Sequence, residues 1–226
     1  MTWIDLGNPV PRGVPIPYQP VIWDTGAHFV LSALPEGLDR PFGEVLDERA
    51  THRCFAGIND QQLGAFLWHA CRTRDTAASS LGFDLEHRTA PSAGAIHPIH
   101  VFLKRPGDEE WWMYNPQSHQ LFLLKHGASR LPGLYEHSLQ VLGGDDATRM
   151  LFVAEPGKTA GKYHDACSLV WRDAGALLAV MALTATAQGL NFCPLGITGE
   201  PWASSLSDQG KLVGVGLALL GSCAGA

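Results

Sequence analysis

The chain has 226 residues, of which 46% are hydrophobic and 17% are charged, and its formal net charge is −6. These values are typical of a single packed domain, or of one domain with an arm, and they exclude a disordered or fibrous protein. The 16 Lys and Arg residues are spread along the chain, so we expect no basic surface for DNA or RNA and no nucleic-acid partner.

The cysteines and the hydrophobic pattern bear on location. Five cysteines are an odd number and none forms a C-x-x-C pair, which argues against a disulfide framework and a structural zinc site. The chain shows no basic start followed by an apolar run, as a secretory signal requires, and no run of about 18 uninterrupted apolar residues to span a membrane. We therefore expect a soluble, cytoplasmic protein with no membrane partner.

The first 41 residues carry seven prolines, a density that prevents regular helix and favours an extended segment. Apolar residues such as Ile16, Tyr18 and Trp23 are too frequent for a solvated linker. We predict a proline-rich arm at residues 1–43 that packs on the body of the chain or on a partner subunit, followed by one domain at residues 44–226.

Arg49, Thr51 and Arg53 alternate along the sequence and share one face if this segment is extended. The planar fork of arginine donates paired, charge-assisted hydrogen bonds to phosphate oxygens. The cluster is therefore either a phosphate site or a solvated charged face.

Hydrophobic spacing predicts several helices and strands after this cluster. Asn59 followed by Gln62 is typical of a helix start, with Leu63, Phe66 and Leu67 at helical spacing behind it. Alternation predicts successive antiparallel strands, two of which flank the turn at residues 115–118. The predicted helices lie at 59–72 and 134–142, and the predicted strands at 98–104, 111–114, 120–124, 149–154 and 211–220.

A run of small residues at 88–98 leads directly into the first of these strands. Small side chains allow backbone N–H and C=O groups to approach a flat ligand closely. The alternative interpretation is an ordinary loop. His97 and His100 lie on opposite faces of the expected strand, which argues against a metal site.

The longest predicted helix runs from Ser168 to Gln188 and ends at Gly189, which suits the left-handed cap position. Its apolar residues cover nearly the whole circumference, so either a second subunit or the rest of the same chain must cover it. Lys162 and Tyr163 precede this helix, and because their ordinary pKa values are about 10.4 and 10, either needs a lowered pKa to act as a base near neutrality. Otherwise they form a surface dipeptide.

Several enzyme classes lack their motifs. The sequence contains no G-x-S-x-G turn, no G-x-x-x-x-G-K-[ST] phosphate loop and no G-x-G-x-x-G after a strand. Hydrolase, nucleoside triphosphatase and Rossmann-fold interpretations therefore lose their main support.

Taken in order, these segments resemble the nitroreductase-like flavoprotein superfamily, and most closely its SagB-type dehydrogenase branch, over residues 44 to 220. That branch is similar to flavoenzymes that oxidise thiazolines and oxazolines in modified peptides. The matching residues are Arg49-x-Thr51-x-Arg53-x-Phe55, Arg88 with Pro91-Ser92-Ala93-Gly94-Ala95-Ile96-His97-Pro98, Lys162-Tyr163 followed by Asp173-Ala174-Gly175, and Gly189-Leu190 with Cys193-Pro194-Leu195-Gly196.

The resemblance implies an α+β nitroreductase-like FMN-binding fold, with a central antiparallel-rich sheet flanked by helices, in an intertwined homodimer that holds FMN at its interface. It implies a small-molecule or modified-peptide substrate, and the residues themselves give no reason to expect a metal. The implied site residues are Lys162 and Tyr163 as the pair that removes a proton; Arg49, Thr51 and Arg53 at the FMN phosphate and ribityl chain; Pro91, Ser92, Ala93 and Gly94 along the isoalloxazine ring; and Pro194, Leu195 and Gly196 on the other side of that ring.

Some residues depart from the family pattern. After Lys162-Tyr163 the chain reads His164-Asp165-Ala166, which lacks the family's glycine and first arginine, and no basic residues of the kind that complete the phosphate site in broader nitroreductases precede Ala226. The first hypothesis is an FMN-dependent dehydrogenase that converts a peptide-derived azoline to an azole. The alternatives are an NAD(P)H-dependent nitro- or quinone reductase and a degenerate, non-catalytic binding subunit.

Overall fold

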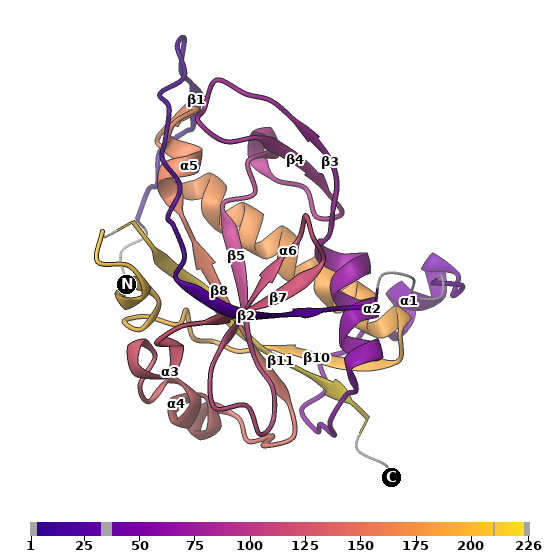
Figure 1. The fold of residues 1–226 in the computed structure, drawn as a ribbon. Coiled ribbons are helices and arrows are strands. Elements are labelled where there is room, and N and C mark those ends of the chain that lie inside the picture. Colours follow the sequence, from indigo (N-terminus) through magenta and orange to yellow (C-terminus); the bar gives the residue numbers. More distant parts are fainter. Residues whose placement is uncertain (1–3, 33–37, 210, 224–226) are drawn as a thin grey trace.

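A computed structural model describes residues 4–32, 38–209 and 211–223. Seven strands form one sheet in the order β10-β11-β8-β5-β6-β7-β2, and every neighbouring pair is antiparallel. Helices lie against this sheet (Figure 1), which confirms the predicted α+β class with a central antiparallel sheet. The strands are β2 (Thr25–Val30), β5 (Ile99–Lys104), β6 (Trp112–Asn115), β7 (Gln120–Leu124), β8 (Thr148–Ala154), β10 (Leu190–Pro194) and β11 (Val213–Ser222).

The inner strand β8 is buried at every position, so its alternating side chains pack in two different layers. Met150 and Phe152 belong to the core beneath α2 (Asp60–Cys71) and α6 (Cys167–Ala187). Leu151 and Val153 belong to the core that contains Leu134, the first residue of α4 (Leu134–Val141). The sheet therefore has hydrophobic packing on both faces.

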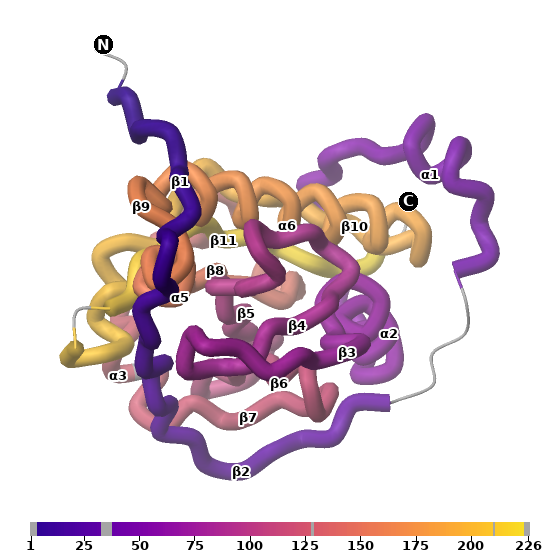
Figure 2. Tube along the Cα trace, turned by 90° about the horizontal axis from the view of Figure 1, so that it is seen from above, coloured from indigo at the N-terminus to yellow at the C-terminus, as the bar shows by residue number. Residues whose placement is uncertain are grey.

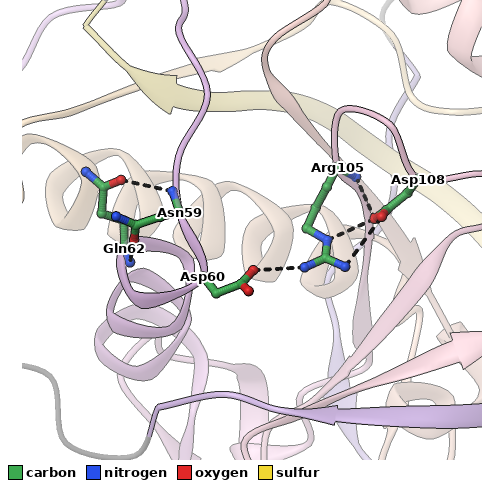
Figure 3. Close-up of polar contacts among 5 residues, drawn as sticks. All are labelled: Asn59, Asp60, Gln62, Arg105 and Asp108. Atoms are coloured by element: carbon green, nitrogen blue, oxygen red, sulfur yellow. Dashed lines mark hydrogen bonds and ion pairs between the residues drawn. The ribbon is translucent and has the colours of Figure 1, made fainter.

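The start of α2 has the predicted cap. Asn59 Oδ1 accepts from the N–H of Gln62 at 2.8 Å, and Gln62 Oε1 accepts from the N–H of Asn59 at 3.0 Å. In the first turn, Asp60 Oδ1 accepts from Arg105 at 2.9 Å, and Arg105 also bonds Asp108 (Figure 3). The reciprocal cap satisfies two backbone groups that would otherwise lack partners, and the carboxylate complements the helix dipole.

The other predicted elements are confirmed with small shifts of their ends. The strand predicted at 211–220 is β11, whose glycines allow close contact: a Cβ on Gly214 would lie 2.5 Å from the carbonyl oxygen of Thr198. Gly189 has a φ of +67° after α6, as its cap position predicts. Elements that the sequence did not predict include β2, β10, α1 (Phe42–Glu48), the hairpin of β3 (Thr73–Ala77) and β4 (Leu85–Arg88), and the short α3 (Gly127–Arg130) and α5 (Pro156–Ala160).

The N-terminal arm lies along the body of its own chain. Its strand β1 (Val10–Pro11) pairs with β9 (Tyr163–His164), and the N–H of Ile16 donates to the carbonyl of Gly161 at 2.8 Å. Farther on, β2 forms the edge of the main sheet beside β7 (Figure 2). Residues 33–37 of the predicted arm lie outside the described part of the chain, and the division between residues 43 and 44 stays a prediction.

The helix α6 crosses the molecule and is covered on one side. It packs against β10 and α2, whereas Trp171 is 44% exposed and Gly175 and Ala179 are exposed too. Among the described residues, α6 is the helix that is long and apolar enough to cross a membrane by length and composition. Its contacts with the sheet make it a core helix of this domain, and its open face leaves room for another surface.

Candidate active site at the N-terminal end of α6

The small-residue run forms a loop with an unusual backbone between β4 and β5. It contains the short helix η1 (Ala93–Ala95), in which Gly94 has a φ of +66°, and Ala95 and His97 have φ values of +58° and +47°. Left-handed backbone is unfavourable for residues with a Cβ and persists only where surrounding contacts enforce it. The loop is therefore held in one specific shape.

Asp173 in α6 supplies the contacts that hold this loop. The hydroxyl of Ser92 donates to Asp173 Oδ2 at 2.5 Å, and the N–H of Ala93 donates to Oδ1 at 3.0 Å. The N–H of His97 donates to Ser92 Oγ at 2.9 Å. Burial raises the pKa of Asp173, and the hydrogen bonds from Ser92 and Ala93 oppose that rise. One helical carboxylate thus fixes the start of the turn directly, and Ser92 connects it to His97 after the turn.

Lys162 and Tyr163 reach the same loop from a distant part of the sequence. Lys162 Nζ donates to the carbonyl of Gly94 at 3.4 Å. A Cβ built on Gly94 would lie 2.7 Å from Lys162 Nζ and 2.9 Å from Tyr163 Oη, so a larger residue would displace both groups from the loop, and the φ of +66° also favours glycine. The structure therefore brings together the predicted Lys-Tyr pair and the predicted loop.

The N-terminal arm makes backbone contacts with the Lys-Tyr pair. Tyr163 pairs with Pro11 across β1 and β9, and the N–H of Arg12 donates to the carbonyl of Lys162 at 2.8 Å. Arg12 Nε also donates to the carbonyl of Ala160 at 2.8 Å. These contacts fix the backbone of the pair and leave both side chains half-buried beside the loop.

A buried carboxylate that the sequence did not reveal joins the arm to the core. Glu155 is fully buried and accepts from Tyr18 Oη at 2.9 Å and from the N–H of Val21 at 2.5 Å, and it pairs with His100 Nε2 at 3.1 Å. Burial opposes ionisation of Glu155, but the hydrogen bonds, led by the one from His100, outweigh it and lower its pKa. A buried charge of this kind is tolerated only with such partners.

Two hollows adjoin the loop. A pocket of about 470 Å³ lies between the β3–β4 hairpin and the loop, with Asp75, His87, Pro91 and Ala95 in its wall. A second cavity of about 40 Å³ lies behind the loop, where Arg88, His97, His100 and Asp173 meet. Burial, followed by the charge of Arg88, lowers the pKa of His97 to about 4. The imidazole is therefore neutral near pH 7.

The predicted phosphate cluster lies elsewhere. Arg49, Thr51 and Arg53 are all exposed, and in the described part of the chain neither arginine pairs with a carboxylate. Just before them, Arg40 bonds the carbonyl of Thr186 near the end of α6 at 3.1 Å. Figure 2 shows α1, which leads into this segment, at the opposite end of α6 from β9. One chain alone does not bring this cluster to the loop.

The third predicted segment lies with the arginine cluster and away from the loop. Pro194 ends β10, and the N–H of Leu195 donates to the carbonyl of Leu217 at 2.8 Å. Leu195 packs in the small core that contains Phe55, two residues after Arg53. Pro194 and Gly196 are exposed. The predicted residues thus form two groups, one at each end of α6.

Comparison with protein families identifies the family of this chain. The family model described as the Nitroreductase family matches residues 46–204, which is more than half of the chain. The chain belongs to the Nitroreductase family. The comparison with curated proteins found no match.

Solved structures share the fold at low sequence identity. A protein described as a nitroreductase from Ralstonia eutropha JMP134 is 19% identical with a TM-score of 0.65, over 94% of this chain and 98% of that one. A chain of the Escherichia coli microcin synthetase McbBCD complex with truncated pro-MccB17 bound is 17% identical with a TM-score of 0.57, over 92% and 79%. A protein described as a nitroreductase in complex with FMN, from Desulfovibrio desulfuricans, is 17% identical with a TM-score of 0.54, over 83% and 88%.

Proposed function

We propose that this nitroreductase-family protein binds FMN between two copies of the chain and acts as a dehydrogenase of the SagB type. The convergence of Lys162 and Tyr163 on Gly94 is the observation that carries the proposal. It joins a loop suited to a flat ring with two groups able to exchange protons. In the proposed reaction, a peptide-derived azoline is oxidised to an azole.

The chemistry of the residues present fits FMN. Arg49 and Arg53 offer exposed guanidinium groups without a carboxylate partner in the described chain, as a phosphate requires. Pro91, Ser92, Ala93 and Gly94 offer small side chains and backbone groups to a ring, and Pro194, Leu195 and Gly196 offer the same on its other side. A solved relative of the same fold is in complex with FMN, which supports the assignment.

A second copy of the chain would bring the two groups of residues together. Asp173, which holds the loop, and Ala187 at the end of α6 are separated by about 21 Å at 1.5 Å per residue. If two α6 helices cross in opposite directions, the loop of one copy meets the arginine cluster of the other. Trp171, Gly175 and Ala179 recur every four residues on the exposed face, and the two small residues permit close approach of a second helix. We infer a homodimer on this basis.

The reaction removes two hydrogens from the heterocycle, one as hydride and one as a proton. Bound FMN supplies the hydride acceptor. Lys162 and Tyr163 remove the proton at their position beside Gly94, where Arg12 fixes their backbone. Asp173 acts through Ser92 and Ala93 by keeping the loop in shape. The similarity to a chain of the microcin synthetase McbBCD complex with truncated pro-MccB17 bound supports a peptide-derived substrate.

The visible absorption spectrum of the purified protein tests the cofactor first. We expect a flavin spectrum, either as purified or after FMN is added. In a flavin-containing protein, Lys162→Ala and Tyr163→Phe should each reduce turnover of an azoline peptide by about 100-fold or more, the usual contribution of acid–base groups, while flavin stays bound. Lys125→Ala, which removes an exposed lysine paired with Asp24, is the matched control. A protein that stays colourless with added FMN, or full turnover in both site variants, contradicts the proposal.

Family membership also favours a second candidate, an NAD(P)H-dependent nitro- or quinone reductase. Rapid-mixing measurement of flavin bleaching distinguishes the two. Fast bleaching by NADPH selects the reductase, whereas slow bleaching with fast reoxidation by O₂ selects the dehydrogenase. A dimer that does not bind FMN would instead identify a non-catalytic binding subunit. All five cysteines are free, which supports our proposal of a cytoplasmic location.

A further inference from the structure

Two arginines lie side by side at the junction of α2 and the β3–β4 hairpin. Arg72 follows the last residue of α2, stacks on the Trp68 ring with its Cζ 4.3 Å from the centroid, and donates to the Trp68 carbonyl at 2.8 Å. Arg74 lies at the irregularity in β3 and donates to Thr89 Oγ1 at 3.2 Å. Helix end, stacking and bulge thus hold two guanidinium groups close together.

These arginines line a pocket that is separate from the arginine cluster at residues 49–53. The pocket has a volume of about 380 Å³, and its wall also contains Thr73, Pro116, Gln117 and His119. His119 Nδ1 bonds Tyr114 Oη at 2.9 Å and its Nε2 bonds the carbonyl of Ser32 at 3.1 Å. Burial lowers the pKa of His119, so the imidazole contributes no charge near pH 7. The positive charge of the pocket comes from Arg72 and Arg74.

The described residues supply no carboxylate to neutralise this pair. The carboxylates of the hairpin have other partners: Glu86 pairs with Arg88 at 2.7 Å and also bonds Thr73 and Gln117. Asp75 pairs with His87 at 3.3 Å. Burial, followed by the charge of Arg74, lowers the pKa of Arg72, which is the effect expected of a desolvated cation beside a like charge.

Arg105 shows what a neutralised arginine looks like in the same protein. It lies over the Trp112 ring at 5.4 Å from the centroid, much as Arg72 lies over Trp68. Unlike Arg72, it donates to both Asp60 and Asp108 at 2.9 Å (Figure 3). The pocket that contains Arg72 and Arg74 lacks such partners within residues 4–32, 38–209 and 211–223.

We propose that Arg72 and Arg74 form an anion subsite that binds a carboxylate or phosphate group. Paired guanidinium groups match the oxygens of either anion, and a partly closed pocket strengthens the attraction. Arg74 contacts Thr89, two residues before Pro91 of the loop, and two residues span about 7 Å of extended chain at most. The subsite therefore lies close enough to anchor the charged end of a molecule that reacts at the loop.

The anion subsite stands without the proposed function, whereas its assignment to the reacting molecule rests on that function. The anion has two sources: an acidic group of a peptide substrate, or a phosphate of a nicotinamide dinucleotide. Binding of either anion at the subsite would raise substrate specificity more than the rate of the chemical step. The reason is that the bonds to the anion form equally in the ground state and the transition state.

Nuclear magnetic resonance of the Arg Nε–H signals tests the subsite directly, with inorganic phosphate and succinate as probes. We expect saturable shifts of the Arg72 and Arg74 signals that weaken as salt is added. Arg74→Gln should weaken both probes about tenfold or more, as loss of a charge-assisted hydrogen bond predicts, and Arg74→Lys should restore part of the affinity. Arg105→Gln is the matched control and should leave both affinities unchanged. Arg74 is exposed, so its variants keep the fold even if Arg72 variants do not.

The same signals identify the source of the anion. Tighter binding of NADPH than of NADH selects the extra phosphate, and tighter binding of an Asp-containing peptide than of its Asn counterpart selects the carboxylate. Shifts that do not saturate, or equal losses in Arg74→Gln and Arg105→Gln, overturn the subsite. Because none of these measurements requires flavin or turnover, their failure is distinct from failure of the proposed function.

Discussion

The two ends of α6 differ in how their polar groups are satisfied. At the N-terminal end, Ser92, Ala93 and Lys162 all have partners within the chain, and a single carboxylate organises the loop. At the C-terminal end, Arg49 and Arg53 are exposed, and within the described chain they lack a carboxylate partner. The N-terminal end is preorganised in the absence of a ligand, whereas the C-terminal end carries positive charges that a ligand can pair with.

This difference separates two tasks within one site. Groups that act on reacting atoms gain from being fixed in advance, because no reorganisation is then needed during the reaction. Groups that grip a charged tail gain from staying accessible until the tail binds. A chain built in this way has half of a site at each end of one helix, and the homodimer that we propose joins the halves.

The largest expected effect comes from separating the two copies of the chain, because the two halves of the proposed site then no longer meet. Ala179→Glu places a carboxylate in the exposed face of α6, where burial of an unpaired charge against a second copy costs several kcal/mol. We expect a monomer that no longer retains FMN, measured by analytical ultracentrifugation and by the flavin absorbance of the purified protein.

Val141→Glu is the matched control, because Val141 is also exposed and apolar but lies at the end of α4. It should leave both assembly and flavin content unchanged. A monomeric Ala179→Glu protein that binds FMN at full strength would show that one chain forms the whole site.

The next largest effect is confined to the arginine cluster at the C-terminal end of α6. Arg53→Ala removes one guanidinium from the proposed phosphate grip and should weaken FMN by about 10- to 100-fold, the value of a hydrogen bond to a charged group. Riboflavin, which lacks the phosphate, is the matched ligand and should bind the variant and the parent protein equally. Fluorescence titration measures both. Equal weakening of the two flavins would remove Arg53 from the phosphate site.

The smallest effect concerns the loop at the N-terminal end of α6 and the pH dependence of folding stability. The folded-state pKa of His97 is about 4 and lies below its ordinary value of 6.5, so the unfolded chain binds the proton more readily. The stability contributed by neutral His97 is therefore present above pH 6.5 and is lost as the pH falls toward 4. We expect His97→Gln to reduce this acid-induced loss by about 1 kcal/mol after allowance for partial exposure.

Urea unfolding at pH 7 and pH 5 checks this effect as the difference between parent and variant. His28→Gln, at an exposed position of β2, controls for the removal of an imidazole. If the parent and His97→Gln proteins lose equal stability between the two pH values, His97 does not contribute to the acid sensitivity.

Sequence patterns predicted most of the buried elements and missed the most exposed ones, although the buried strand β10 was missed too. The cap at Asn59 and the alternation in β5 are local signals, and both were confirmed. Edge strand β2 was missed because most of its residues are exposed, so no alternation between buried and exposed positions marks it. The β3–β4 hairpin was missed for the same reason, because residues such as Arg74, Asp75 and His87 face solvent.

The candidate site was predicted in pieces. Resemblance supplied the loop and the Lys-Tyr pair, and the structure joins them at Gly94. The joining contacts could not be read from the sequence, because Ser92 and Asp173 are 81 residues apart and no spacing rule connects them. The bond between Tyr18 and Glu155 could not be read from the sequence for the same reason, because 137 residues separate the two. Whether the arginine cluster joins the loop depends on a second copy, which is why that part stays a proposal.

The proline-rich arm has a consequence for the cooperativity of the molecule. Proline has no N–H to donate, so the arm attaches through the few residues that have one, chiefly Arg12, Ile16, Tyr18 and Val21. Arg12 and Ile16 attach to residues 160–162, immediately beside the catalytic candidates. Detachment of the arm and increased mobility of Lys162 are therefore expected to be one local unfolding event. The rate of amide hydrogen exchange in residues 10–18 would then report the stability of the backbone at Lys162.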